Sequence, residues 1–196
     1  MADLLRIILQ SEMFYLSAFG LLAPILALFL TDKIPSINLL NVGIAVGLYL
    51  LTLGILRPFI QLASRDDSRG LRTFHLLWFG GLLISMMPFL YILSRDIVDI
   101  YVAQILYGVG VVFMEPAVLK IMGTTCNIKK QGHWENFNTA DSLLAAGFAA
   151  VSGFITQKQG LEAMFSYIGL VLLLTAFIIA ALYWRVVLKA HLGKRI

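Results

Sequence analysis

Long apolar segments, separated by short polar hinges, occupy almost the whole of this chain. Each segment can cross a bilayer as an α-helix, which needs ~20 mostly apolar residues to cover ~30 Å of hydrocarbon. Continuous apolar runs such as residues 168–174 favour helices, because a membrane barrel shows ~10-residue stretches of alternating polarity. We therefore predict one all-α integral membrane domain, residues 1–196, with six transmembrane helices at residues 12–30, 39–60, 74–93, 98–122, 138–156 and 163–188.

The composition supports this fold class. Hydrophobic residues make up 60% of the chain and charged residues 13%, a balance that would leave a soluble domain with exposed apolar surface. The first apolar segment is too long for a cleaved signal peptide and lacks a compact basic start, so we expect it to be retained.

The basic residues predict the orientation. With both termini cytoplasmic, the cytoplasmic segments hold all of the 15 Lys and Arg residues except Lys33, Arg95 and Lys158. This bias follows the positive-inside rule and predicts a multi-pass protein of the plasma (inner) membrane. It also explains the net charge of +4 as a topology signal, so we expect the lipid bilayer as a partner and no nucleic acid.

Little in the sequence indicates catalysis or a cofactor. Cys126 is the single cysteine, so no internal disulfide can form, and the three histidines are scattered without metal-ligand spacing. The chain has no nucleotide-binding motif, which excludes ATP hydrolysis within it. We expect a protein that is not an enzyme and that has no cofactor and no metal.

Three segments carry a family resemblance. Residues 57–72 resemble the cytoplasmic loop signature of the major facilitator superfamily, Pro-x-x-Gly-x-Leu-Ala-Asp-Arg followed by basic residues. The matching positions are Pro58, Leu62, Ala63, Arg65 and Arg72. The signature glycine and aspartate are Gln61 and Ser64 here, and Asp66 and Asp67 are candidates for the missing carboxylate. Residues 104–110 resemble the superfamily's Arg-x-x-Gln-Gly-x-Gly pattern, with both glycines present, and residues 160–165 resemble its Gly-Trp-x-x-x-Phe pattern at the start of span six.

The resemblance covers essentially the whole chain and implies an architecture. Superfamily transporters usually have twelve spans in two halves, each half a pair of inverted three-helix repeats, with the substrate between the halves. This chain resembles one half. One half leaves a wall of the aqueous path open to lipid, so we expect a symmetric homodimer. Span two of one protomer would then pack against the small residues of the partner's span five, although these residues could instead face a neighbour in their own protomer.

Ionisable residues inside spans are costly and indicate function. Glu115 has no counter-charge among its helical neighbours and precedes Pro116, which suits proton exchange or cation contact. A snorkelling or hydrogen-bonded structural glutamate is the alternative. Asp141 is a second candidate for proton coupling, with the polar end of a helix as its alternative.

The remaining candidates follow from the superfamily geometry. Ser17, Gln104 and Tyr107, together with Glu115, are expected to line the substrate cavity. Arg57, Ser64 and Arg65 are expected at a cytoplasmic gate, where they would meet Glu135 of the partner protomer. The expected function is secondary transport of a small solute by alternating access, as a symporter or a uniporter. The alternative is a non-transporting membrane scaffold, or one subunit of a heterodimeric transporter.

Overall fold

The computed structural model describes residues 38–64, 71–125 and 131–192, and every element in these ranges is an α-helix. The helices are α3 (Leu39–Ser64), α4 (Leu71–Leu93), α5 (Ile97–Thr125), α6 (Gln131–Gln159) and α7 (Leu161–Leu192). Three of them contain an internal proline, which membrane helices tolerate because neighbouring helices and side chains satisfy the freed backbone groups.

Four of these helices are long and apolar enough to cross a membrane: Leu40–Leu62, His75–Leu93, Ile97–Lys120 and Leu161–Leu182. They confirm the all-helical class, are compatible with a membrane protein, and correspond to the second, third, fourth and sixth predicted spans. The first predicted span, residues 12–30, lies outside the described residues. The fifth, residues 138–156, lies within α6, which is not among the four over its described residues.

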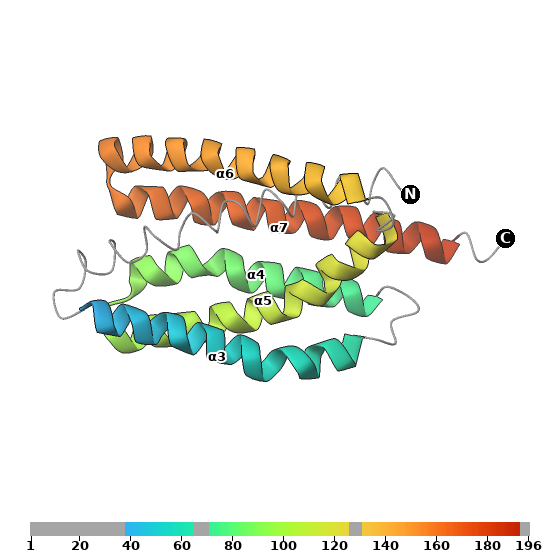
Figure 1. The fold of residues 1–196 in the computed structure, drawn as a ribbon, viewed down its shortest axis with the longest axis horizontal. Coiled ribbons are helices and arrows are strands. Elements are labelled where there is room, and N and C mark those ends of the chain that lie inside the picture. The colour runs from blue at the N-terminus through green and yellow to red at the C-terminus, as the bar shows by residue number, and fades with distance from the viewer. Residues whose placement is uncertain (1–37, 65–70, 126–130, 193–196) are drawn as a thin grey trace.

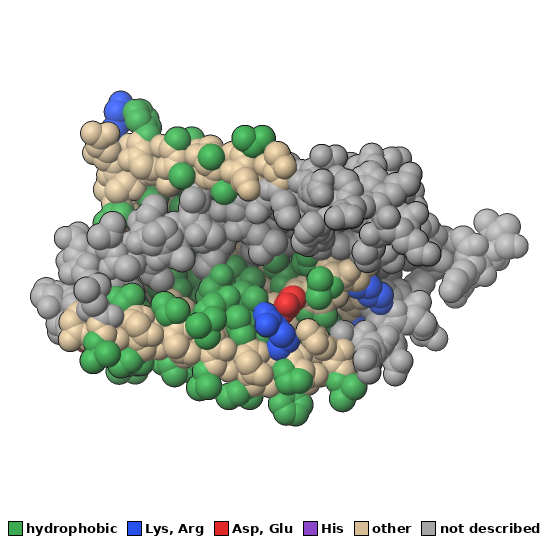
Figure 2. All heavy atoms as spheres, viewed as in Figure 1, with side chains coloured by type: hydrophobic (Ala, Val, Ile, Leu, Met, Phe, Trp, Pro, Cys, Tyr) green, Lys and Arg blue, Asp and Glu red, His purple; other side chains and the backbone are tan. Residues whose placement is uncertain are grey.

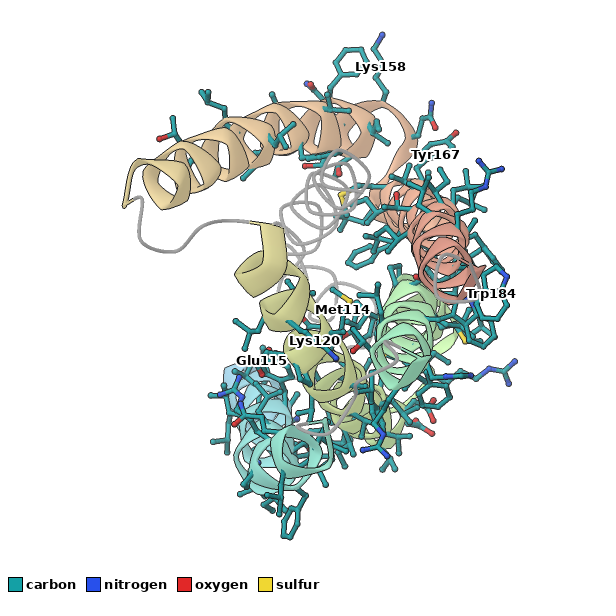
Figure 3. The ribbon with its side chains drawn as sticks, turned by 90° about the vertical axis from the view of Figure 1, so that its right-hand side faces the viewer. Met114, Glu115, Lys120, Lys158, Tyr167 and Trp184 are labelled. Atoms are coloured by element: carbon teal, nitrogen blue, oxygen red, sulfur yellow. The ribbon has the colours of Figure 1, made fainter. Side chains whose placement is uncertain are left out.

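The helices form a row in which sequence neighbours are not always spatial neighbours. Helix α5 packs between α3 and α4, α7 packs on the other side of α4, and α6 contacts α7. Consecutive helices run in opposite directions, so α3 and α5 run parallel to each other (Figure 1). Seen along the helices, the row curves, with α3 and α6 at its two ends (Figure 3).

Two glycines allow α5 to sit between α3 and α4. Gly108 and Gly110 are two residues apart, so they point to opposite sides of the helix. A Cβ on Gly108 would lie 2.8 Å from the Cβ of Thr52 on α3, and a Cβ on Gly110 would lie 2.9 Å from a side-chain carbon of Ile84 on α4. Both helices therefore approach the backbone of α5 more closely than any larger residue would permit.

The core lies among α4, α5 and α7. Its largest fully buried side chains include Met87, Tyr91, Ile100, Phe165 and Leu172, and the rings of Tyr91 and Phe165 meet edge to face at 6.2 Å. Large apolar side chains are exposed along α3, among them Leu40, Leu50, Ile55, Phe59 and Leu62. Lipid or a partner protein can cover such a face, since in a bilayer no water meets it.

Candidate functional site

Polar side chains collect along the contact between α3 and α5, which are otherwise apolar. On α3 they are Tyr49, Thr52 and Arg57, and on α5 they are Gln104, Tyr107 and Glu115. Tyr49 lies three residues before Thr52 and eight before Arg57, and Tyr107 lies three residues after Gln104 and eight before Glu115, so each tyrosine is near the same side of its helix as its two partners in the set. Because the helices run parallel, each of these α3 residues meets an α5 residue at nearly the same separation in sequence: residue 49 meets 107, 52 meets 108, and 57 meets 115. We call this line of contacts the α3–α5 polar seam.

Two tyrosines stack at the middle of the seam. The ring centroids of Tyr49 and Tyr107 are 4.7 Å apart, and the ring planes differ by 14°. Both residues lie within about one turn of the centres of their spans, Leu40–Leu62 and Ile97–Lys120. Tyr107 was a predicted cavity residue and Tyr49 was not. A tyrosine at mid-span, away from the interface belt where tyrosine usually lies, is the signal that identifies Tyr49.

The seam is tightly packed just beside this stack. Thr52 donates its hydroxyl hydrogen to the carbonyl oxygen of Leu48 at 2.8 Å, which satisfies the hydroxyl group within α3. The methyl side of Thr52 then lies against Gly108, with no room for a larger residue at position 108. The glycine of the predicted superfamily pattern thus has a packing role in this seam.

An ion pair lies nearer the expected cytoplasmic end of the seam. The Nε of Arg57 on α3 donates a hydrogen bond to Oε2 of Glu115 on α5 at 2.7 Å, between residues 58 positions apart in the chain. The side chains are 43% and 30% exposed, respectively. Figure 2 shows an acidic side chain beside a basic one among hydrophobic side chains over α3 and α5, and Figure 3 places Glu115 where these helices meet.

This pair corrects one expectation and bears on another. Glu115 was expected to lack a counter-charge because its own helical neighbours offer none; the counter-charge comes from α3. Arg57 was expected to face a carboxylate of the partner protomer, and within one chain it contacts Glu115. Both residues lie five positions before the ends of their spans, about 7–8 Å along the helix axis, so the pair is inside the membrane-spanning part.

Gln104 is buried beside the seam, with 4% of the residue exposed. It lies one helical turn before Tyr107 on α5. No hydrogen bond joins its amide to another described side chain or backbone group. A buried amide ordinarily has hydrogen-bond partners, so we expect a neighbouring segment or a bound solute to supply those of Gln104.

The other predicted site residues are placed only in part. Ser17 and Arg65 lie outside the described residues. Ser64 belongs to the last turn of α3, and Glu135 and Asp141 belong to α6, at the other end of the row from α3. Within one chain, the structure therefore brings Gln104, Tyr107 and Glu115 together with α3 but does not bring α6 to Arg57. The cross-protomer contact of Arg57 with Glu135 stays a prediction.

A separate pocket of about 270 Å³ lies between the C-terminal end of α4 and the N-terminal end of α5, away from the ion pair. Its lining is mostly apolar, and its polar groups already have partners: Ser94 donates to the carbonyl oxygen of Leu90, and Asp99 accepts hydrogen bonds from the backbone N–H groups of Arg95 and Asp96. The Asp99 carboxylate thereby caps the start of α5. None of the predicted site residues lines this pocket, which leaves the seam as the candidate site.

Among the described residues, no group of three or more His, Cys, Asp or Glu side chains is placed to hold a metal ion. No protein-family model, no curated protein and no solved structure matches this chain.

Proposed function

We propose that this protein is a secondary transporter of a small solute, a half-size relative of the major facilitator superfamily that works as a homodimer by alternating access. One observation carries the proposal: apolar membrane helices keep a polar seam that extends from an ion pair, Arg57–Glu115, to the middle of the spans at Tyr49–Tyr107. Intramembrane ionisable residues mark solute or ion pathways, and transporter sites lie near the midplane.

The energetics of the ion pair support a functional reading. Two charges taken out of water lose several kcal/mol of hydration each, and well-packed apolar residues of similar size often stabilise a fold better than a buried pair. A helix contact that needed only stability could use leucine at positions 57 and 115. The retention of charge there favours a role in recognising a solute or in changing conformation.

The exposed face of small residues on α6, at one end of the row of helices, supports the homodimer. An added Cβ at Gly147 or Gly153 of α6 meets nothing within 4 Å, although small residues at these positions normally serve close helix packing. Ala146, Ala149 and Ala150 of the same helix are also exposed. A second copy placed against α6 by a two-fold axis would cover this face and complete the wall of the solute path, with α6 as a crossing helix.

The expected cycle uses the α3–α5 seam as one wall of the cavity. Protomers would rock about the two-fold axis, and the two copies of Tyr107 and Gln104 would face a shared solute. A change of conformation at the seam would require the Glu115 carboxylate to separate from Arg57, with which it shares a hydrogen bond. The basic residues orient the end of α3 and the start of α4 toward the cytoplasm of a bacterial-type inner membrane or an equivalent plasma membrane.

Uptake into proteoliposomes tests this function directly. The reconstituted protein should accumulate or equilibrate at least one member of a panel of radiolabelled sugars, amino acids, amines and carboxylates, measured with and without a pH gradient. Tyr107→Ala should abolish that uptake, whereas Leu174→Ala, an exposed position on α7, should leave it unchanged. Protein-free liposomes give the baseline, and no uptake above it for any solute would contradict the proposal.

A membrane scaffold or a heterodimer subunit is the second candidate. The observation that favours it is that Glu115 already has Arg57 as its partner, so the pair can serve as a fixed cross-link between α3 and α5. In that case no solute is transported, and stability is the property that substitutions in the seam would change.

A further inference from the structure

We infer that the Arg57–Glu115 pair recognises a zwitterionic solute, one that carries a carboxylate or phosphate and an ammonium group a few atoms apart. This inference rests on the transporter function proposed above and names its class of solute. Its basis is the geometry of the pair, in which one hydrogen bond, from Nε to Oε2, joins two groups that can each make several.

The arginine side of the pair has unused donors. A guanidinium carries five N–H donors in a planar fork and ordinarily binds a carboxylate through two parallel hydrogen bonds. Here Glu115 contacts Nε, and the two terminal nitrogens of Arg57 have no hydrogen-bond partner among the described residues. The side chain is 43% exposed, so an incoming pair of oxygens can reach this fork.

The glutamate side has a matching unused acceptor. Oε2 of Glu115 accepts from Arg57, and Oε1 has no partner among the described residues. An ammonium group has three donors and suits such an oxygen. Because Nε and Oε2 are only 2.7 Å apart, a ligand that spans the guanidinium fork and Oε1 needs its two charges close together, as in an amino acid or the phosphodiester glycerophosphoethanolamine.

Charge balance selects the same class. The pair has no net charge and lies about 7–8 Å inside the spans, where an added unpaired charge is costly. A zwitterion adds no net charge and offers each protein group an opposite partner. An anion would meet repulsion from Glu115 and a cation repulsion from Arg57, whereas a neutral polyol offers only weaker, uncharged hydrogen bonds.

Ligand-induced thermal shift of the purified full-length protein, with calorimetry for affinity, tests the inference. The probes are glycine, L-leucine, β-alanine and glycerophosphoethanolamine. L-leucinamide, N-acetyl-L-leucine and glucose serve as the cationic, anionic and neutral controls. At least one zwitterion should raise the unfolding temperature, and the singly charged analogues of L-leucine should bind roughly tenfold or more weakly than L-leucine if that is the ligand.

Two conservative variants separate recognition from folding. Arg57→Lys keeps the charge but lacks the fork, and Glu115→Gln keeps the size but lacks the charge. Each should fold and should lose the response to zwitterions by about tenfold or more in affinity. Arg185→Lys, at an exposed position of α7, is the matched control and should respond as the wild type does.

Three results would overturn the inference: no response to any zwitterion, an undiminished response in Arg57→Lys, or stabilisation only by phosphatidylethanolamine in nanodiscs and by no soluble zwitterion. Other results distinguish this inference from the proposed function. Uptake of a solute that is not zwitterionic would support the transporter function and contradict the zwitterionic solute class. Binding of a zwitterion without any uptake would support the zwitterion site and contradict the transporter function.

Discussion

A Cβ atom on Gly80 of α4 would lie 2.6 Å from the carbonyl oxygen of Gly110 on α5. The two helices therefore meet backbone to backbone at this crossing, and this contact holds α5 against α4 while its other side carries the polar seam. The site thus depends on a contact on the far side of the helix that presents it.

Gly80→Ala should destabilise the protein by roughly 1–3 kcal/mol, because the added methyl group meets backbone atoms that cannot move independently. Gly81→Ala is the matched control, since its Cβ would meet the Cβ of Ala176 at an ordinary 3.5 Å. Thermal unfolding in detergent measures both. Equal stability of the two variants would show that the crossing is looser than described.

The two single substitutions of the ion pair, with their effects added together, should destabilise the protein more than the double substitution does. Arg57→Ala or Glu115→Ala leaves a charge without its partner inside the span, whereas the double variant leaves none. We expect a coupling free energy of roughly 1–3 kcal/mol, between the values for exposed and buried pairs, from a double-mutant cycle of unfolding. Additive effects would mean that the two residues do not interact in the membrane.

The exchanged pair, Arg57→Glu with Glu115→Arg, should recover part of that stability because it restores opposite charges on α3 and α5. It should not recover uptake, since the guanidinium fork and the carboxylate would then lie on the wrong helices for the same solute. Unfolding temperature and proteoliposome uptake are measured on the same preparation. Full uptake by the exchanged variant would assign the pair a purely structural role.

Loss of a ring of the tyrosine stack should lower stability more than loss of a hydroxyl group, which removes only the side-chain hydrogen bond between Tyr49 and Tyr107. Tyr49→Phe keeps the stacked ring, and Tyr49→Leu removes it, which we expect to cost about 0.5–1.5 kcal/mol beyond the lost apolar area. If the hydroxyl groups bind solute, Tyr107→Phe should raise the KM for uptake, and the lost hydrogen bond to Tyr49 should lower stability by about 0.5–1.5 kcal/mol. A KM unchanged in Tyr107→Phe would remove that hydroxyl from the solute site.

Bulky residues on α6 should weaken the dimer without unfolding the protomer. Gly147→Leu and Gly153→Leu add side chains where the chain itself has open space, so only a partner pressed against this face would clash with them. Native mass spectrometry from mild detergent should show a dimer for the wild type and more monomer for both variants. Leu174→Phe, at an exposed position of α7, is the control. A wild-type protein that is monomeric and fully active would rule out the dimer.

Hydropathy alone determined the membrane class and the bounds of four spans, because lipid leaves a long apolar segment no structure but a helix or a closed barrel. The predicted 98–122 and the observed Ile97–Lys120 differ by one or two residues for this reason. Sequence also identified Gln104, Tyr107 and Glu115 as candidates, since polar groups in a span are few and costly.

Only the tertiary structure decided which residues meet. Arg57 reaches Glu115 across 58 residues of chain because α5 passes between α3 and α4, and that order depends on Gly108 and Gly110 admitting a neighbour on each side. No local pattern contains this information: periodicity tells which face of a helix is polar, whereas the partner of that face depends on the packing of helices distant in sequence. The stacking partner of Tyr107 and the charge partner of Glu115 were therefore visible only once the helices had been placed.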